Sequence, residues 1–173
     1  MKYPILITGA AGFIGYHICR RLLDAGWRVI GVDCLSDYYD VSLKQKRESM
    51  LLEYTAYHSV NEKIQTPGVL MKVFKEETPQ IVVHLAAQAG VRHSIDHPRS
   101  YLENNIVGTF EILEAARAYP PEHMLIASTS SVYGANENLP YKESDKADSQ
   151  MSFYAATKKS TENMAYSYAH LFN

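Results

Sequence analysis

A tyrosine and a lysine stand four residues apart near the end of the chain, in the segment Tyr154-Ala155-Ala156-Thr157-Lys158. On a helix this spacing places both side chains on one face. The lysine charge favours the phenolate and moves the tyrosine pKa towards the range in which a phenol can act as a base. Such a pair is suited to taking the proton of a hydroxyl group while hydride leaves the same carbon. The same spacing also occurs on solvated helix faces without chemistry, so the surrounding segments decide its meaning.

Four hydroxyl residues, Ser128-Thr129-Ser130-Ser131, follow a short apolar run that predicts a buried strand. In open parallel sheets, ligands bind outside the carboxyl ends of the strands. We therefore expect these hydroxyls to face the Tyr154–Lys158 pair. Together the two segments predict a site for proton transfer.

A glycine-rich segment, Thr8-Gly9-Ala10-Ala11-Gly12-Phe13-Ile14-Gly15, follows the first apolar run and opens the first predicted helix. Its glycines permit a tight turn, a close approach of the backbone to a pyrophosphate, and close packing of helix on strand. The helix N-terminus adds N–H groups and partial positive charge, which favour an anion. The Gly-x-x-Gly-x-x-Gly spacing is one residue longer at its start than the usual dinucleotide-binding pattern.

Asp33 ends the second apolar run, about twenty residues beyond the glycine segment. Its carboxylate is expected to accept hydrogen bonds from ribose hydroxyls and to repel a 2′-phosphate. The pattern therefore predicts NAD as the cofactor in preference to NADP. The alternative is a glycine turn of purely structural importance and a solvated aspartate.

Short apolar runs alternate with helical stretches along the whole chain. The predicted strands cover residues 5–7, 28–32, 54–60, 81–85 and 124–128, and the predicted helices cover residues 12–25, 41–53, 69–77, 99–119 and 152–171. The first helix is expected to bury Ile14, Ile18, Leu22 and Leu23 on one face. Strands that alternate with helices imply right-handed crossovers and a parallel sheet covered on both faces. We predict an α/β fold, a Rossmann-like doubly wound parallel sheet.

The sequence contains five strand candidates, whereas a complete dinucleotide-binding fold has six. It also stops directly after a helix, which would leave the last strand as an exposed edge. We therefore expect residues 1–173 to form one NAD-binding domain that is truncated after about five strands and lacks a C-terminal substrate-binding lobe.

The composition excludes several classes of partner. With a net charge of −2 and no basic run, the chain lacks the clustered positive charge that is typical of proteins that bind nucleic acid or a membrane surface. Two cysteines are too few for a disulfide framework and favour a reducing compartment. Since no segment resembles a signal peptide or a membrane span, we expect a cytoplasmic location.

Four residues that invite a functional interpretation are expected to be structural. His93 and His97 could be imagined as metal ligands, but they precede or flank Pro98 without a further convergent ligand, so a surface loop and no metal site is predicted. Cys19 is expected to be a small buried hydrophobic residue, and His84 a structural residue at a strand end.

Taken together, these segments resemble the extended short-chain dehydrogenases/reductases of the NAD-dependent epimerase/dehydratase family, which act on nucleotide sugars. The segments that carry the resemblance are 8–15, Asp33, 84–89, 105–109, 128–134 and 154–158. The resemblance implies that Tyr154 is the catalytic base, that Lys158 holds the nicotinamide ribose, and that Thr129 assists the proton transfer.

The resemblance also implies a set of ligand-binding residues. Those expected to bind the cofactor are Gly9, Gly12, Phe13, Ile14, Gly15, Asp33, Leu85, Ala86, Ala87, Gln88, Asn105, Tyr154 and Lys158. Those expected to contact the substrate are Arg92, Ser130 and Ser131. In this family the helix at 99–119 and the last helix form a dimer interface, so the resemblance implies a homodimer.

Within the family the chain is most similar to UDP-glucuronate 4-epimerases. Related dehydratases carry Thr-Asp-Glu where this chain has Thr129-Ser130-Ser131, so the carboxylates needed for elimination of water are missing. The segments 37–44 and 89–92 resemble those of the uronate epimerases. The implied reaction is transient oxidation and re-reduction at C4 of a UDP-sugar, with UDP-glucose as the rival substrate. A non-catalytic dinucleotide-binding fragment remains the alternative.

Two positions depart from the family pattern. The aspartate that usually follows the third strand and touches adenine is absent, and Asn61 or Lys63 is expected in its place. Cys34 stands where an asparagine often follows the acidic residue.

Overall fold

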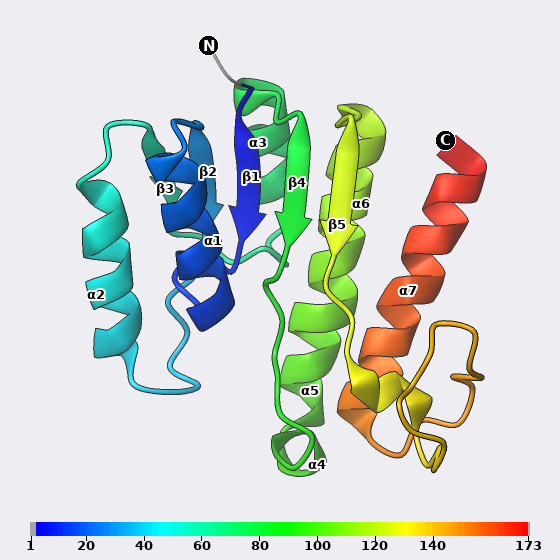
Figure 1. Cartoon of the computed structure of the whole chain (residues 1–173). Helices are drawn as coiled ribbons and strands as arrows, with labels where there is room; N and C mark the ends of the chain where they lie inside the picture. The colour runs from blue at the N-terminus through cyan, green and yellow to red at the C-terminus, as the bar shows by residue number, and fades with distance from the viewer. Residues whose placement is uncertain (1–2, 173) are drawn as a thin grey trace.

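A computed structural model describes residues 3–172, which form a parallel five-stranded sheet with helices on both sides (Figure 1). The strands are β1 (Ile5–Thr8), β2 (Val29–Val32), β3 (Tyr57–Val60), β4 (Ile81–His84) and β5 (His123–Ile126). Their order in the sheet is β3-β2-β1-β4-β5, so the chain runs outward in one direction from β1 and then returns to the other side of it. This doubly wound order confirms the predicted α/β fold and creates a switch point between β1 and β4.

Helices connect and cover these strands. They are α1 (Phe13–Asp24), α2 (Val41–Leu52), α3 (Val69–Glu77), α4 (His93–Asp96), α5 (Pro98–Tyr101), α6 (Gly108–Ala118) and α7 (Phe153–Phe172). A π-helical turn, η1 (Leu102–Val107), joins α5 to α6, and a 3-10 turn, η2 (Ser130–Tyr133), follows β5. In Figure 1, α1 lies in front of the sheet and α3 and α6 lie behind it, while α7 stands beyond the β5 edge.

Side chains that alternate along β1 supply both layers of the core. Leu6 packs with residues of α3 and α6, whereas Ile5 and Ile7 pack with residues of α1 and α2. This division follows from the strand geometry, in which successive side chains point to opposite faces. The strands β1 and β2 are therefore buried on both sides, as their continuous apolar runs require, whereas Leu125 of β5 remains 48% exposed.

The first helix is present, but its buried face differs from the prediction. The residues of α1 that are buried are Gly15, Tyr16, Cys19 and Leu23, and those that are partly buried against the core are Ile18 and Leu22. Ile14 is 61% exposed, so its placement in the core was wrong. It lies in the first turn, which faces the cavity at the carboxyl edge of the sheet. Cys19 is completely buried, as predicted.

Three other segments depart from their predicted form. The helix expected at 99–119 is divided by η1, and the strand expected from residue 54 begins only at Tyr57. Residues 93–96 form one helical turn where a loop was predicted. The rings of His93 and His97 lie 4.3 Å apart, and residues 3–172 contain no cluster of three or more metal-ligating side chains. Nor does any helix in the described part of the chain have the length and apolar character needed to span a membrane.

His84 closes β4 and links three elements through its ring. The Thr8 hydroxyl accepts hydrogen bonds from the Leu85 and Ala86 N–H groups, so it donates its own proton to His84 Nδ1, at 2.7 Å. His84 Nε2 then carries the hydrogen and faces the Thr109 hydroxyl at 3.2 Å. Burial, together with the charge of Lys158, lowers the His84 pKa to about 3. The structural role predicted for this histidine agrees with these contacts.

The depressed pKa of His84 predicts an acid-dependent loss of stability. Between about pH 6.5 and pH 3 the unfolded chain binds a proton at this ring that the folded chain does not. The contribution of His84 to the free energy of unfolding is therefore complete above pH 6.5. It falls by about 1.4 kcal/mol per pH unit as the pH decreases through this window. Urea unfolding at several pH values should show a shallower decline in His84→Gln than in the wild type. The exposed His123→Gln is the control and should retain the wild-type slope.

Candidate active site

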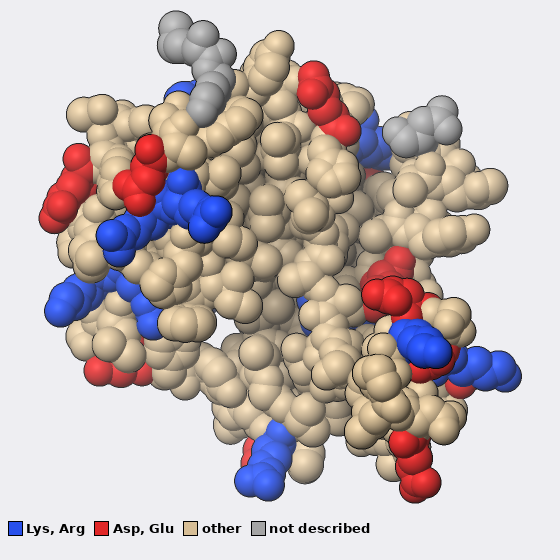
Figure 2. Space-filling model, in the orientation of Figure 1, with Lys and Arg blue, Asp and Glu red and all other residues tan. Residues whose placement is uncertain are grey.

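A cavity of about 670 Å³ opens at the carboxyl ends of the strands, at the switch point between β1 and β4 where the strand order reverses. Its wall is made by the glycine segment, the connection from β2 into α2, the loops after β3 and β4, the end of β5, and α7. Figure 2 shows the molecule hollowed below the sheet in this region. Ligands of doubly wound sheets bind at such switch points, so this cavity is the site to which the predicted functional residues must be compared.

The glycine segment forms the floor of the cavity and is packed too tightly for side chains. Gly9 has φ +73°, and a Cβ there would lie 2.9 Å from the backbone nitrogen of Ala86. At Gly15 a Cβ would overlap the carbonyl oxygen of Gly9 and lie 3.0 Å from Ala10 Cα. Gly12 is the N-cap of α1 and has no capping side chain, so the first N–H groups of the helix remain available to an anion.

Asp33 joins the end of β2 to the glycine segment. One carboxylate oxygen accepts a hydrogen bond from the Ala11 N–H at 3.1 Å, and the other accepts one from the Leu35 N–H at 2.8 Å. The side chain also lines the cavity. Each carboxylate oxygen has a second lone pair, so Asp33 can accept bonds from ligand hydroxyls without giving up its own structural bonds.

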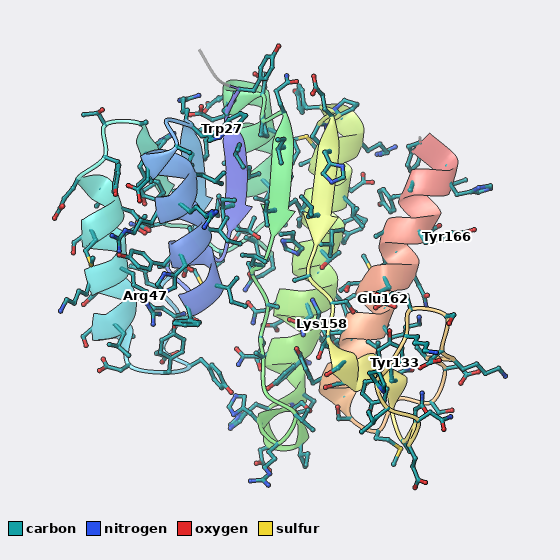
Figure 3. The ribbon with its side chains drawn as sticks, in the orientation of Figure 1. Trp27, Arg47, Tyr133, Lys158, Glu162 and Tyr166 are labelled. Carbon is teal, nitrogen blue, oxygen red and sulfur yellow. The ribbon has the colours of Figure 1, made fainter. Side chains whose placement is uncertain are left out.

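The first residues of α2 bring two cations to the same end of the cavity, which the sequence analysis did not predict. Lys44 Nζ donates to Ser36 Oγ at 2.8 Å and lies 4.8 Å from the centre of the Tyr39 ring. Arg47, labelled in Figure 3, donates to the Ala11 carbonyl at 3.3 Å and to the Tyr39 hydroxyl at 3.0 Å. The sequence contained a signal for both cations. Residues three apart on a helix share one face, and the helix that carries Lys44 and Arg47 follows the Asp33 segment.

The loop after β3 supplies a further polar contact that the sequence analysis placed differently. Glu62, Ile64 and Gln65 line the cavity, whereas the expected Asn61 and Lys63 do not. The Gln65 Oε1 atom is buried and is the one buried side-chain oxygen or nitrogen in residues 3–172 without a hydrogen-bond partner. A buried acceptor without a partner is costly, so a hydrogen-bond donor that reached this oxygen would be stabilising.

The segment after β4 lines the cavity with its backbone and small side chains. Leu85, Ala86, Ala87 and Gln88, which the resemblance predicts to bind the cofactor, all belong to the wall. Asn105 instead lies behind the wall and is 1% exposed. Its amide accepts from the Gln88 N–H at 2.7 Å and donates to the Gln88 carbonyl at 3.1 Å. Because these polar atoms are already engaged, Asn105 positions the wall and does not itself face the cavity.

The Tyr154–Lys158 pair projects into the cavity from the start of α7. The Tyr154 ring contacts the Tyr101 ring edge to face, with centres 5.9 Å apart. Lys158 is 5% exposed, and burial lowers the pKa of its ammonium, while the charge of Glu162 acts in the opposite direction. Figure 3 labels Lys158 on the helix beside the strand ends. The fold thus brings the predicted base and its cation to the glycine segment, more than 130 residues away in sequence.

The hydroxyl cluster divides between the cavity and the turn that follows it. Ser128 lines the cavity, and its hydroxyl donates to Glu162. Thr129 caps η2, since its hydroxyl accepts a hydrogen bond from the Ser131 N–H at 3.2 Å and lies 3.3 Å from the Ser131 hydroxyl. The predicted catalytic Thr129 therefore lies next to the cavity wall but not in it. The predicted substrate residues Ser130, Ser131 and Arg92 are also outside the wall.

Cys34 offers a direct test of what occupies the cavity. It lines the wall beside Asp33 and is partly exposed, whereas Cys19 is buried and its thiol pKa is raised to about 12, mainly by burial. In the folded chain a thiol reagent should modify Cys34 and spare Cys19. A dinucleotide in the cavity should slow this reaction, as mass spectrometry of partly labelled protein would measure. Equal rates with and without the ligand would contradict the placement of the ligand beside Asp33.

Comparison with known proteins shows the family to which the chain belongs. A family model described as GDP-mannose 4,6 dehydratase matches residues 6–173. A probable UDP-glucuronate 4-epimerase of Rhizobium meliloti (strain 1021) is 48% identical over 172 residues, which are 99% of this chain and 50% of that protein.

Two solved structures have the same fold. The UDP-glucuronic acid 4-epimerase of Bacillus cereus, in complex with UDP-glucuronic acid and NAD, gives a TM-score of 0.90 at 33% identity, over 98% of this chain and 53% of that one. The UDP-glucose 4-epimerase of Thermotoga maritima, with UDP-glucose, gives 0.84 at 30% identity, over 98% and 52%. The chain thus spans about half the length of the relatives that it matches.

Proposed function

The chain belongs to the GDP-mannose 4,6 dehydratase family of extended short-chain dehydrogenases/reductases, and on this premise we propose that it is an NAD-dependent nucleotide-sugar 4-epimerase acting on UDP-glucuronate. The observation that carries the proposal is that the glycine segment, Asp33 and the Tyr154–Lys158 pair line one cavity at the switch point of the sheet. A nucleotide-binding floor and a proton-transfer pair in one cavity are what such a reaction requires.

NAD fits the residues of the cavity. Gly12 leaves space for a pyrophosphate at the start of α1, Gly9 and Gly15 allow the close backbone packing of the segment, and Asp33 offers acceptors for ribose hydroxyls while repelling a 2′-phosphate. Gln65 lines the same cavity, and its partnerless Oε1 atom suits an amino group such as that of adenine. Lys158, which lines the cavity from α7, would hold the nicotinamide ribose.

The chain's own residues account for the proton movements of the reaction. Tyr154 accepts the proton of the C4 hydroxyl, Thr129 assists this transfer from beside the wall, and the Lys158 ammonium stabilises the phenolate. The glycine segment, Asp33 and Lys158 would hold NAD, which would supply a reversible acceptor for the C4 hydride. After the 4-keto sugar has rotated in the site to present its other face, Tyr154 gives its proton back, so epimerisation proceeds without net oxidation.

Two features favour epimerisation over elimination of water. Thr129-Ser130-Ser131 contains no carboxylate, so the turn after β5 lacks the acid and base that a dehydratase needs. The proteins most similar to the chain also include epimerases of UDP-glucuronate. UDP-glucose is the rival substrate, and the similarity to the Thermotoga maritima enzyme supports keeping it in the assay.

Thermal unfolding with NAD⁺, with NADP⁺ and without ligand tests the cofactor first. A ligand present at about one hundred times its dissociation constant should stabilise the folded chain by about 2.7 kcal/mol. We expect a rise in Tm with NAD⁺ and a smaller one with NADP⁺. No rise with either would overturn the proposal.

Turnover is then measured by the conversion of UDP-glucuronate to UDP-galacturonate, with UDP-glucose in a parallel assay. The chain is assayed alone and joined to the C-terminal half of the Rhizobium meliloti relative, because it spans about half of that protein. Stabilisation by NAD⁺ without turnover in either form would favour the alternative of a non-catalytic dinucleotide-binding protein. Turnover of UDP-glucose alone would reassign the substrate.

We further propose a homodimer through the outer faces of α5 to α6 and of α7. Leu102, Val107 and Phe110 leave large apolar side chains exposed on the first of these faces, and Tyr166 is 78% exposed on the second. Figure 3 shows Tyr166 directed away from the rest of the molecule. Sedimentation equilibrium would give the mass of a dimer, and Phe110→Glu should reduce it to that of a monomer. A wild-type chain that sediments as a monomer would contradict this arrangement.

A further inference from the structure

A glutamate that the proposed mechanism does not use lies one helical turn beyond Lys158. Glu162 accepts a hydrogen bond from the Ser128 hydroxyl at the end of β5 and another from the Lys159 ammonium at 2.8 Å. Ser128 lines the cavity, so this carboxylate connects α7 to the cavity wall. Figure 3 shows Lys158 and Glu162 on successive turns of α7.

The charge of Glu162 also acts on Lys158. The Lys158 residue is 5% exposed, and burial by itself favours the neutral amine. Glu162 opposes this effect, since its negative charge raises the Lys158 pKa. The pKa of Glu162 is itself lowered: burial raises it, but the hydrogen bonds from Lys159 and Ser128 and the charges of Lys159 and Lys158 outweigh burial.

The remaining titratable groups around Lys158 do not replace this charge. His84, at the end of β4, stays neutral because its pKa is about 3. Tyr154 on α7 and Tyr101 on α5 are phenols, and Tyr101 has its pKa raised, mainly by burial. Lys159 is a cation that is already paired with Glu162. Among residues 3–172, Glu162 is therefore the negatively charged residue that raises the pKa of Lys158.

Building on the proposed function, we propose that Glu162 is a positioning residue for the Tyr154–Lys158 pair. Its carboxylate holds the Ser128 hydroxyl in the cavity wall and keeps the buried Lys158 ammonium in its charged form. Because that ammonium stabilises the Tyr154 phenolate and holds a ribose, removal of the Glu162 charge weakens both tasks at alkaline pH. A neutral lysine could perform neither in the same way.

The alternative is an ordinary ion pair of α7 with Lys159, three residues earlier. Exposed pairs of this kind contribute little, and their loss would leave Lys158 unaffected. Glu162→Gln separates the two explanations, since glutamine keeps an oxygen that can accept the Ser128 hydrogen bond but removes the charge.

The chain contains a matched control on α6. Glu114 accepts a hydrogen bond from the Tyr168 hydroxyl at 2.7 Å and from Arg117 at 2.6 Å, so it too joins a hydroxyl and a neighbouring cation. Its charge acts on those two residues and not on Lys158. Glu114→Gln should therefore reproduce the loss of an equivalent ion pair without changing the lysine.

The experiment is a pH titration of the lysine ¹³Cε resonances by NMR, in the ligand-free chain labelled with [¹³C]lysine. Lys158→Arg identifies the Lys158 signal by its disappearance. We expect the Lys158 transition to move to lower pH in Glu162→Gln and to stay at its wild-type position in Glu114→Gln. A wild-type transition in folded Glu162→Gln would overturn the proposal.

Glu162→Asp is the second variant, in case the glutamine variant does not fold. It keeps the charge but withdraws it by one methylene, so the Lys158 transition should again move to lower pH. In a turnover assay the alkaline limb of kcat should move in the same direction. Because the NMR titration needs neither NAD nor sugar, its failure rejects the role of Glu162 alone. The absence of an NAD-induced rise in Tm would instead reject the proposed function.

Discussion

Replacement of Tyr154 by phenylalanine should lower the rate of epimerisation by about 10² to 10⁴, the usual contribution of a positioned acid or base. The substitution removes only the phenolic oxygen, so the ring keeps its edge-to-face contact with Tyr101. Tyr154 is one of the expected cofactor contacts, but the glycine segment, Asp33 and Lys158 are untouched, so binding of NAD⁺ should change little. The loss should therefore appear in kcat and not in the thermal shift that NAD⁺ produces.

Tyr166→Phe is the control for this prediction. Tyr166 lies on the same helix, is 78% exposed and is not part of the cavity wall, so its loss should leave turnover unchanged. The assay follows UDP-glucuronate and UDP-galacturonate in whichever form of the chain is active. If Tyr154→Phe retained wild-type turnover, the proton would have to be taken by another group, and the assignment of Tyr154 as the base would be wrong.

Alanine at Gly15 should destabilise the chain and abolish binding of NAD⁺. The new Cβ would overlap the Gly9 carbonyl oxygen and lie 2.8 Å from the Gly9 carbonyl carbon. These are backbone atoms that cannot rotate away, so the glycine segment must shift. Overpacking of this kind costs about 1–3 kcal/mol, which corresponds to a decrease in Tm of roughly 2–12 °C for a domain of this size.

Alanine at Gly12 is the matched comparison within the same segment. Its Cβ would meet the Gly9 carbonyl oxygen at 3.0 Å and no second residue within 4 Å, so the protein itself can accommodate it with a smaller adjustment. The methyl group would instead occupy space that a pyrophosphate needs. We expect a Tm close to that of the wild type and a loss of the NAD⁺-induced rise. Normal NAD⁺ stabilisation in Gly12→Ala would show that the pyrophosphate does not approach this glycine.

Local patterns in the sequence were sufficient to predict the architecture. Continuous apolar runs such as 5–7 and 81–85, each followed by helical periodicity, indicate buried parallel strands, because only a sheet covered on both faces buries such runs. The glycine segment and Asp33 could be recognised because the turn, the close approach and the carboxylate lie within one strand–helix–strand unit. Their chemistry depends on neighbours that are close in the sequence.

Contacts between distant segments decided what the sequence could not. Ile14 has the periodicity of a core residue, yet the first turn of α1 projects beyond the sheet and exposes it to the cavity. Asn105 lies in a segment that resembles a cofactor-binding motif, but its amide, on the η1 turn, is bonded to the Gln88 backbone. Periodicity reports which face of a helix is apolar, and it does not report which neighbour covers that face.

The residues that the sequence analysis missed show the same limit. Lys44, Arg47 and Gln65 reach the cavity because β2 lies beside β1 and β3 lies beside β2 in the sheet, an order that no local pattern encodes. Glu162 gains its proposed role only because β5 brings Ser128 against α7. The sequence by itself determined the elements, the glycine floor and the identity of the tyrosine–lysine pair, whose geometry is local. The tertiary structure alone decided which side chains share the cavity, because burial and electrostatic coupling depend on distances in space between segments far apart in the chain.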